Sequence, residues 1–251
     1  MSFAFAVIIP SRYGASRLPG KPLLEIGGES LIQHVYRAAR KSQAEEVIVA
    51  TDDDRIEDAV RSFGGEVIMT NCRHASGTDR IAEVARIKNY ADDMIVVNVQ
   101  GDEYALPEVQ INQLAQALNN NPHKPMATLC EKIENPEDMR NSHIVKVVRD
   151  INDTAIYFSR SSIPWAENQT EQHENNFCVY RHIGIYAYRA AFLKQFSELP
   201  VCTIEKSERL EQLRALYNGF KIHVEEACVP GGIGIDTEDD LQRARVLHGS
   251  N

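Results

Sequence analysis

The chain has 251 residues, of which 43% are hydrophobic and 25% are charged, and its formal net charge at pH 7 is −9. This composition is that of a globular protein with enough length for one large α/β domain, or for a domain with an inserted lobe. The acidic balance argues against a nucleic-acid-binding surface, because a phosphate backbone demands a basic face, whereas a small anion can still bind a local cluster of cations.

The cysteine pattern and the lengths of the apolar runs indicate in which cellular compartment the protein is expected. The five cysteines, Cys72, Cys130, Cys178, Cys202 and Cys228, are odd in number and include no C-x-x-C pair, which argues against a disulfide framework and a zinc knuckle. We expect buried thiols in a reducing compartment. The N-terminal apolar run lacks a basic leader, and no run reaches the roughly eighteen residues of a membrane span. The prediction is a soluble, cytoplasmic protein without membrane contact.

Residues 3–22, FAFAVIIPSRYGASRLPGKP, are an apolar run that leads into a loop of glycines, prolines and cations. Residues 3–9 are apolar throughout, which predicts a strand covered on both faces, as in a parallel sheet, and ended by Pro10. In the loop, Gly14 and Gly20 allow the backbone to approach a ligand, and two further prolines stiffen the path.

Three cations of this loop are candidates to bind a triphosphate. Arg12, Arg17 and Lys21 follow the carboxyl end of the predicted strand, where open α/β sheets bind ligands. A cation about 4 Å from a phosphate oxygen contributes ~4 kcal/mol at an effective dielectric near 20, so three converging cations suit a tetra-anionic triphosphate. A solvated basic loop is the alternative. The glycine spacing is one residue too long for a Walker A loop, and no G-x-G-x-x-G follows the strand.

Strands and helices alternate up to about residue 125, with apolar strands predicted at 46–50, 66–69 and 94–99. Three aspartates, Asp52 to Asp54, resemble a metal site, but Asp53 and Asp54 open a helix, where carboxylates favour the helix dipole. Capping is therefore the preferred interpretation. The predicted fold is α/β, with a Rossmann-like, doubly wound, mainly parallel mixed sheet.

Beyond residue 125 the pattern of the sequence changes to alternation, which predicts a smaller lobe of mixed or antiparallel strands. We expect one domain over residues 1–251. Its parts are a mainly nucleotide-binding half at 1–125, a sugar-binding and dimerisation lobe at 126–226, and a return to the core at 227–251.

Two segments of the second half have a distinct pattern. Residues 207–216 predict a helix with Leu210, Leu213 and Tyr217 on its buried stripe. Residues 166–176 are polar without periodicity, which predicts an exposed, mobile loop.

A carboxylate follows the strand at 94–99 within the sequence QGDE. A side chain at this edge of the sheet lies where a ligand binds, so Asp102 is a candidate metal ligand. Gln100 can hydrogen-bond sugar or ribose hydroxyls, and Gly101 permits a close approach. A turn-forming aspartate is the alternative interpretation of Asp102.

Together the segments IIPSRYGASRLPGKPL, NVQGDE, RHIGIY and LEQLR resemble the sugar nucleotidyltransferase family, and within it the branch that acts on 3-deoxy-manno-octulosonate (Kdo). The resemblance spans approximately residues 3–245. Two departures are Ser11, where the family usually has alanine, and Tyr104, where it usually has proline.

The resemblance implies a Mg²⁺-dependent cytidylyltransferase that transfers CMP from CTP to the anomeric hydroxyl of Kdo, giving CMP-Kdo and pyrophosphate for lipopolysaccharide biosynthesis. It also implies a cytoplasmic homodimer. A cytidylyltransferase for a related acid sugar, such as an 8-amino Kdo analogue or a sialic acid, stays open. So does a noncatalytic nucleotide-binding scaffold.

The same resemblance implies roles for individual residues. Mg²⁺ would bind Asp102 and Asp236, while Arg12, Arg17 and Lys21 would stabilise the departing pyrophosphate, and these five form the catalytic set. The nucleotide would be bound by Pro10, Arg12, Gly14, Lys21, Ser76, Arg80 and Gln100, with Arg80 selecting cytosine. The acceptor would be bound by Gln100, Arg160, His182, Tyr186, Glu211 and Gln212.

Several of these residues have a structural alternative. Ser76 and Asp236 are each placed to cap a helix. Arg160 can form a structural salt bridge, and Glu211 and Gln212 fall off the buried stripe of their helix, as on a solvated face. Lys146 lies in NSHIVKVV, where the family usually has NPNAVKVV, and a solvated lysine on a strand is the alternative there.

Overall fold

The structure, a computed structural model, describes residues 3–14, 18–165 and 179–249. At its centre every residue of β1 (Phe5–Pro10) is buried. This strand pairs in parallel with β4 (Glu46–Thr51) and β6 (Ile95–Asn98), and β4 pairs in parallel with β5 (Glu66–Met69). The strand is apolar throughout because both faces of the parallel sheet are covered.

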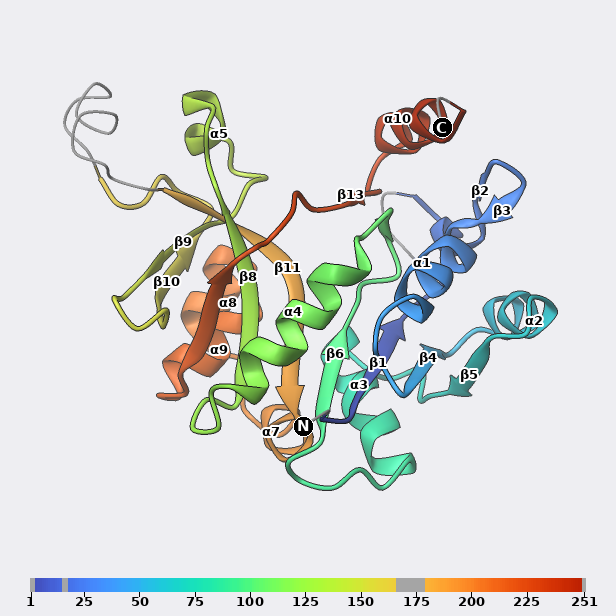
Figure 1. The fold of residues 1–251 in the computed structure, drawn as a ribbon, viewed down its shortest axis with the longest axis horizontal. Helices are drawn as coiled ribbons and strands as arrows, with labels where there is room; N and C mark the ends of the chain where they lie inside the picture. Colours follow the sequence, from blue (N-terminus) through green and yellow to red (C-terminus); the bar gives the residue numbers. More distant parts are fainter. Residues whose placement is uncertain (1–2, 15–17, 166–178, 250–251) are drawn as a thin grey trace.

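Alternate residues of β1 pack into two hydrophobic cores. Val7 and Ile9 pack with α1 (Leu31–Arg40), α2 (Asp54–Ser62) and α4 (Glu108–Asn119) on one face of the sheet. Ala6 and Ile8 pack with α3 (Gly77–Ile87) and α7 (Ala190–Phe196) on the other face. Figure 1 shows α1 and α4 in front of the sheet. The predicted doubly wound α/β fold is confirmed.

The second half of the chain continues the same sheet through β11 (Tyr180–Arg189), which pairs antiparallel with β6. On its other side β11 pairs antiparallel with β8 (Met126–Lys132), and nearer its start Tyr180 and Arg181 pair antiparallel with β9 (Lys146–Arg149) on the same side as β6. β10 (Ala155–Ser159) pairs antiparallel with β9, and β12 (Ile222–Glu226) pairs in parallel with β8. The result is one nine-stranded sheet in the order β10-β9-β11-β6-β1-β4-β5, with β8 and β12 branching from β11.

Short elements complete the fold. They are the 3-10 helix η1 (Lys21–Leu23), the hairpin of β2 (Glu25–Ile26) and β3 (Glu29–Ser30), the two-residue strands β7 (Glu103–Tyr104) and β13 (Ile233–Gly234), and the helices α5 (Pro136–Arg140), α8 (Thr203–Glu208), α9 (Gln212–Tyr217) and α10 (Glu238–Gly249). Among the helices that the structure describes, none is both long and apolar enough to cross a membrane.

The helix predicted at residues 207–216 is wrong as one element. α8 ends at Glu208 and α9 begins at Gln212, because Arg209 adopts the left-handed conformation at φ 54°. Leu210 and Leu213 are buried as predicted, but Tyr217 is 61% exposed, since it is the last residue of the short helix α9.

The prediction of buried thiols is only partly right. Cys130 and Cys202 are buried, whereas Cys72 and Cys228 are exposed, because both lie in connections between elements. Cys178 and the loop predicted at residues 166–176 lie outside the described residues.

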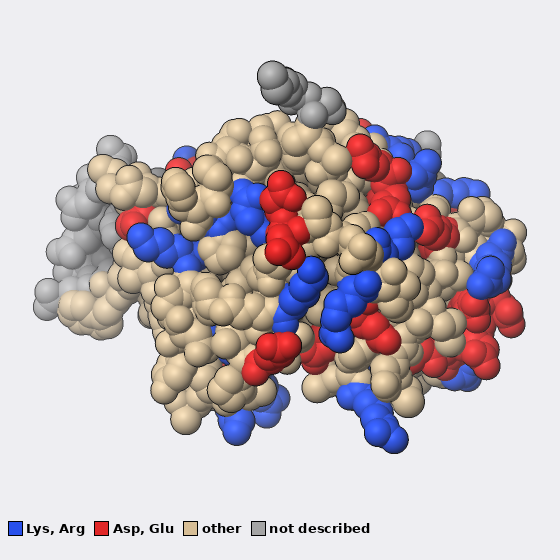
Figure 2. All heavy atoms as spheres, turned by 90° about the horizontal axis from the view of Figure 1, so that it is seen from below, with Lys and Arg blue, Asp and Glu red and all other residues tan. Residues whose placement is uncertain are grey.

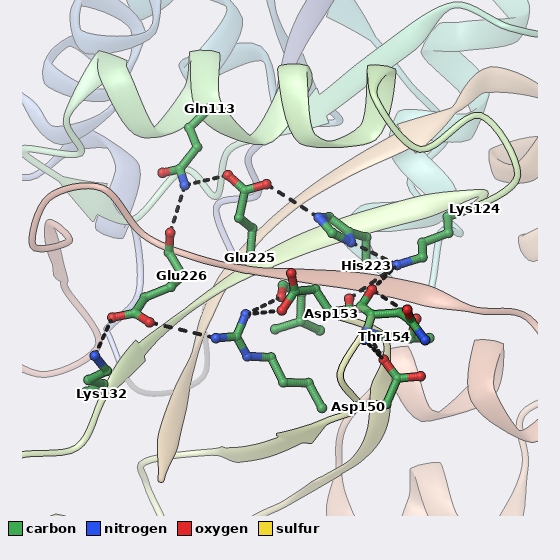
Figure 3. A network of polar contacts seen from close by, with 12 residues as sticks. Gln113, Lys124, Lys132, Asp150, Asp153, Thr154, His223, Glu225 and Glu226 are labelled. Atoms are coloured by element: carbon green, nitrogen blue, oxygen red, sulfur yellow. Dashed lines mark hydrogen bonds and ion pairs between the residues drawn. The ribbon is translucent and has the colours of Figure 1, made fainter. Parts of the chain in front are cut away.

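A polar network fastens the hairpin between β9 and β10 to the neighbouring strand β12 (Figure 3). Lys124 Nζ donates to the carbonyl oxygen of Asn152 at 2.9 Å and lies 2.9 Å from Nδ1 of His223. Arg149 pairs with Asp153, and the N–H of Val224 donates to the Asp153 carbonyl. These contacts attach the β9–β10 hairpin, at one end of the sheet, to β12. Over the face in Figure 2, cations and carboxylates are interspersed without an extended basic patch.

Candidate active site

A cavity of about 280 Å³ opens at the carboxyl ends of β1 and β6. Its walls come from the loop after β1, the turn before α3, the segment after β6 and the turn before α10. The residues singled out in the sequence that line it are Pro10, Arg12, Lys21, Ser76, Arg80, Gln100, Asp102 and Asp236. Residues of both halves of the chain therefore share one cavity.

Two acids from distant parts of the chain meet at one lysine. Lys21 Nζ donates to Oδ2 of Asp102 at 2.6 Å and to Oδ1 of Asp236 at 3.1 Å. The backbone brings the acids together: β7 pairs antiparallel with β13, and the N–H of Ile235 donates to the Asp102 carbonyl oxygen at 3.0 Å. This short ladder places Asp236 beside Asp102.

The acid pair creates a strongly negative point in the cavity. Burial lowers the pKa of Lys21, but the charges and hydrogen bonds of Asp102 and Asp236 outweigh burial and raise the pKa above its ordinary value. Burial raises the pKa of the neighbouring Glu103 to about 7, and the charges of the two aspartates act in the same direction. The site favours a cation and disfavours a third negative charge.

The structure describes only part of the loop after β1. Arg12 is exposed and lines the cavity, whereas Arg17 lies outside the described residues. Gly20 has a φ of +70°, and a Cβ added there would lie 3.1 Å from the ring of Tyr13, so glycine is required at this turn. Gly14 is exposed and does not line the cavity. Its predicted close approach to a ligand stays a prediction.

The turn before α3 combines a helix cap with a buried cation. Ser76 and Asp79 form a capping box, so the predicted capping role of Ser76 is confirmed. Ser76 also lines the cavity. Arg80 is only 4% exposed, and its guanidinium pairs with Asp52 at 3.0 Å and donates to Thr70. The two contacts fix Arg80 in the cavity wall.

The three aspartates before α2 divide their roles. Asp53 is the N-cap and accepts from the N–H of Arg55 at 3.1 Å, and Asp54 lies in the first turn, so the capping interpretation of these two is confirmed. Asp52 instead pairs with Arg80. Sequence analysis missed this contact, because the partner is on a different helix.

The residues predicted to bind the acceptor, apart from Gln100, are not among the residues that line this cavity. His182 and Tyr186 lie side by side on β11, with ring centroids 5.3 Å apart, and His182 Nε2 lies 2.9 Å from Oγ1 of Thr128. Glu211 accepts a hydrogen bond from Thr78, in the first turn of α3. Ser76, two residues earlier, lines the cavity, so Glu211 lies close to the edge of the cavity.

Burial shifts the pKa values of His182 and Glu211. It lowers the pKa of His182 to about 3, so the imidazole is neutral near pH 7. It also raises the pKa of Glu211, against the hydrogen bond from Thr78. Gln212 is 5% exposed, and its side-chain nitrogen makes no hydrogen bond to any described residue. The interpretation as a solvated helix face is therefore wrong for Gln212, whereas Glu211 is half-buried at the N-terminus of α9 and bonded to Thr78.

The Arg160 guanidinium donates to the backbone of two other segments, the end of α8 and the connection before β9. Its Nε donates to the Glu208 carbonyl oxygen at 2.8 Å and its Nη1 to the Ser142 carbonyl oxygen at 3.0 Å. The structure thus does not bring the guanidinium into the cluster of His182 and Tyr186. Lys146, from the protein interior, also donates to the segments that contain Ser142 and Arg160.

Lys146 is fully buried, so its interpretation as a solvated strand lysine is wrong. Its Nζ donates to three backbone carbonyl oxygens, those of Asn141 at 2.9 Å, Ile144 at 2.6 Å and Arg160 at 2.6 Å. All three donors of the ammonium are satisfied, which is the condition for burying a lysine.

The donor set of the acid pair fits a hard divalent cation. Within the described parts of the chain, no group of three or more His, Cys, Asp or Glu residues could hold a metal. Asp102 and Asp236 instead supply two carboxylates at the edge of a cavity, and Mg²⁺ commonly takes one or two carboxylates and completes its shell with water and phosphate oxygens.

Comparison with known proteins agrees with this geometry. A family model described as "Cytidylyltransferase" matches residues 6–222. The 3-deoxy-manno-octulosonate cytidylyltransferase of Nitrosococcus oceani is 50% identical over 249 residues, covering 97% of this chain and 96% of the relative. The enzyme of the same name from Hahella chejuensis is 51% identical over 248 residues, covering 97% of each chain.

Solved structures show the same fold. A CMP:2-keto-3-deoxy-manno-octonic acid synthetase complexed with CTP superposes with a TM-score of 0.90 at 43% identity, over 98% of this chain and 99% of that chain. A putative glucose-1-phosphate thymidylyltransferase from Bacillus anthracis, at 18% identity and a TM-score of 0.66 over 98% and 95% of the two chains, shares the fold alone. The chain belongs to the cytidylyltransferase family and, within it, to the 3-deoxy-manno-octulosonate cytidylyltransferases.

Proposed function

We propose that this protein transfers CMP from CTP to the anomeric hydroxyl of Kdo, releasing pyrophosphate, and that it does so with Mg²⁺, in the cytoplasm, as a homodimer that serves lipopolysaccharide biosynthesis. The observation that carries the proposal is the contact of Lys21 with both Asp102 and Asp236 at one cavity. The chain is also 50% identical to a relative named 3-deoxy-manno-octulosonate cytidylyltransferase.

The reaction is a displacement at the α-phosphorus. The anomeric oxygen of Kdo forms a bond to that phosphorus, the bond to the bridging oxygen of the β-phosphate breaks, and the hydroxyl proton is released. Negative charge moves onto the pyrophosphate, so cations placed around it lower the barrier. Arg12 and Lys21 lie in the cavity wall for this role, and Arg17 is proposed from the sequence.

Asp102 and Asp236 would hold Mg²⁺, which supplies charge neutralisation and alignment of the phosphate oxygens when bound. The acids themselves accept cations on the cavity side, as their shared contact with Lys21 indicates. Neither acid is needed as a nucleophile in this displacement.

Arg80 and Gln100 line the cavity and are proposed to contact the nucleotide. Asp52 fixes the orientation of the buried Arg80 guanidinium. The N–H groups that remain can therefore donate in fixed directions to the acceptor atoms O2 and N3 of cytosine. The neighbouring cluster of His182, Tyr186 and Glu211 is proposed to receive Kdo, because an imidazole, a phenol and a carboxyl group can hydrogen-bond the hydroxyls of a sugar acid.

The test is pyrophosphate release from CTP with Mg²⁺ and Kdo, each omitted in turn. We expect release to require all three, and Asp102→Asn and Asp236→Asn to abolish it while near-native thermal melting shows that both variants fold. Normal turnover of both variants would remove the acid pair from the reaction. Faster turnover with an 8-amino analogue or a sialic acid would assign a different acceptor.

A further inference from the structure

The C-terminal helix carries little hydrophobic surface into the core. In α10, Leu241 and Ala244 are the buried residues, while Val246 and Leu247 are 69% and 48% exposed. Only two buried apolar side chains in this helix, one of them an alanine, give it weak anchorage, because helix docking depends mainly on a buried apolar face. The helix therefore needs further contacts to hold Asp236, which lies directly before it.

Such a contact joins the last turn of α10 to the strand that follows Asp102. Tyr104 is 7% exposed, and its hydroxyl lies 3.0 Å from Nδ1 of His248. The ring of His34, on α1, packs edge-on against both, with centroid distances of 5.2 Å to Tyr104 and 5.4 Å to His248. His34 itself is fixed by a 2.8 Å hydrogen bond from Nε2 to the Ile26 carbonyl oxygen.

The hairpin of β2 and β3 closes the other side of His248. A Cβ on Gly27 would lie 2.0 Å from Nε2 of His248, so the imidazole packs directly on a backbone that only glycine can supply at φ +60°. Nearby, Arg245 Nε donates to the Glu25 carbonyl oxygen at 3.1 Å. His248 thus contacts a tyrosine, a histidine and a glycine turn on one side, while its other side is exposed to solvent.

These contacts close a ring through the acid pair. From Tyr104 the β7–β13 ladder leads to Asp236, α10 leads from Asp236 to His248, and His248 returns to Tyr104. Because Tyr104 lies two residues after Asp102, one side chain fixes the Asp102 loop and the far end of the helix that follows Asp236. A ring of this kind restricts the separation of the two carboxylates.

We propose that Tyr104 and His248 are positioning residues: they latch α10 to the Asp102 loop and so hold Asp236 beside Asp102 for a divalent cation. The metal in this inference rests on the proposed function, but the contact between Tyr104 and His248 does not depend on a metal. Neither residue lines the cavity, so both act through the acids.

The experiment compares Tyr104→Phe and His248→Leu with the wild-type chain in two measurements. The first is Mn²⁺ binding followed by its electron paramagnetic resonance, and the second is amide hydrogen exchange of residues 236–249. Loss of this one part-buried hydrogen bond should weaken Mn²⁺ binding about three- to tenfold and speed exchange in α10 by a similar factor. The double variant should add little to either single one, since both remove the same bond.

His248→Asn, whose Oδ1 can take the place of Nδ1, should recover part of the Mn²⁺ affinity. Val246→Ala, at an exposed position of the same helix, is the matched control and should change neither measurement. Unchanged exchange in both test variants would overturn the latch, and faster exchange with unchanged Mn²⁺ affinity would overturn its positioning role. If wild type and Asp102→Asn bind Mn²⁺ equally, the metal assignment in the proposed function fails, and hydrogen exchange alone then decides on the latch.

Discussion

Replacement of Lys146 by methionine tests whether a buried ammonium organises the loop that contains Arg160. The substitution keeps much of the aliphatic stem but removes three hydrogen bonds to backbone carbonyl oxygens. Hydrogen bonds from a charged donor contribute ~1.5 kcal/mol or more each, which gives ~4 to 5 kcal/mol for the three. Burial lowers the pKa of Lys146, so dehydration of the charge opposes this gain. We expect a net loss of about 3 kcal/mol in the free energy of unfolding.

For a chain of this size such a loss lowers the melting temperature by ~6 to 12 °C, which differential scanning calorimetry and urea unfolding can both measure. Lys194→Met is the control, because Lys194 pairs with the exposed Asp92 and such pairs contribute about 0 to 1 kcal/mol. Equal stability of the two methionine variants would refute the reasoning, since the three carbonyl groups would then be satisfied without the ammonium.

Three further predictions concern the cavity and its border. Without nucleotide, Lys21→Met should bind Mn²⁺ about tenfold more tightly, because the ammonium that contacts both acids is removed. The variant should bind CTP about tenfold more weakly, because the proposed phosphate loop loses a cation. Titration calorimetry measures both affinities. Arg80→Ala should lower the preference for CTP over UTP in kcat/KM by about tenfold, and unchanged preference would exclude Arg80 from base selection. The pKa of His182 is lowered to about 3 from an ordinary 6.5, so the unfolded chain binds the extra proton, and stability should fall by up to ~1.4 kcal/mol for each pH unit below about 6.5. His182→Asn should flatten that pH dependence in urea unfolding, and an unchanged slope would contradict an imidazole that stays neutral in the folded chain.

The sequence predicted the parallel half of the fold well, because apolar strands and amphipathic helices have periods that local side chains impose. It predicted one helix at residues 207–216, since nothing in the apolar period announces a left-handed residue at Arg209. Lys146 was open to interpretation as a solvated strand residue for a related reason. Its three carbonyl partners lie in turns that have no hydrophobic period, so only the folded chain shows that the ammonium is buried.

Asp102 could be found from the sequence because it follows a buried strand directly. Asp236 came from family resemblance, since its position next to Asp102 depends on two strands of two residues each, β7 and β13, which are too short to give a pattern. The latch of Tyr104 and His248 also joins distant segments, and a histidine near the end of a helix has no sequence signal of its own. Local structure was readable in the sequence, whereas pairwise contacts across the fold were not.

The position of Lys21 links the two halves of the proposed chemistry. It was predicted to bind phosphate with Arg12, yet in the structure its ammonium contacts both acids that are proposed to hold the metal. A divalent cation between Asp102 and Asp236 would repel that ammonium at a distance of a few ångströms, and a triphosphate in the cavity would attract it. Metal and nucleotide should therefore favour each other's binding, with Lys21 moving from the acids to the phosphate. In Lys21→Met this coupling should fall, so that CTP raises Mn²⁺ affinity by a smaller factor than in the wild type. An equal factor in both proteins would show that Lys21 does not link the two sites.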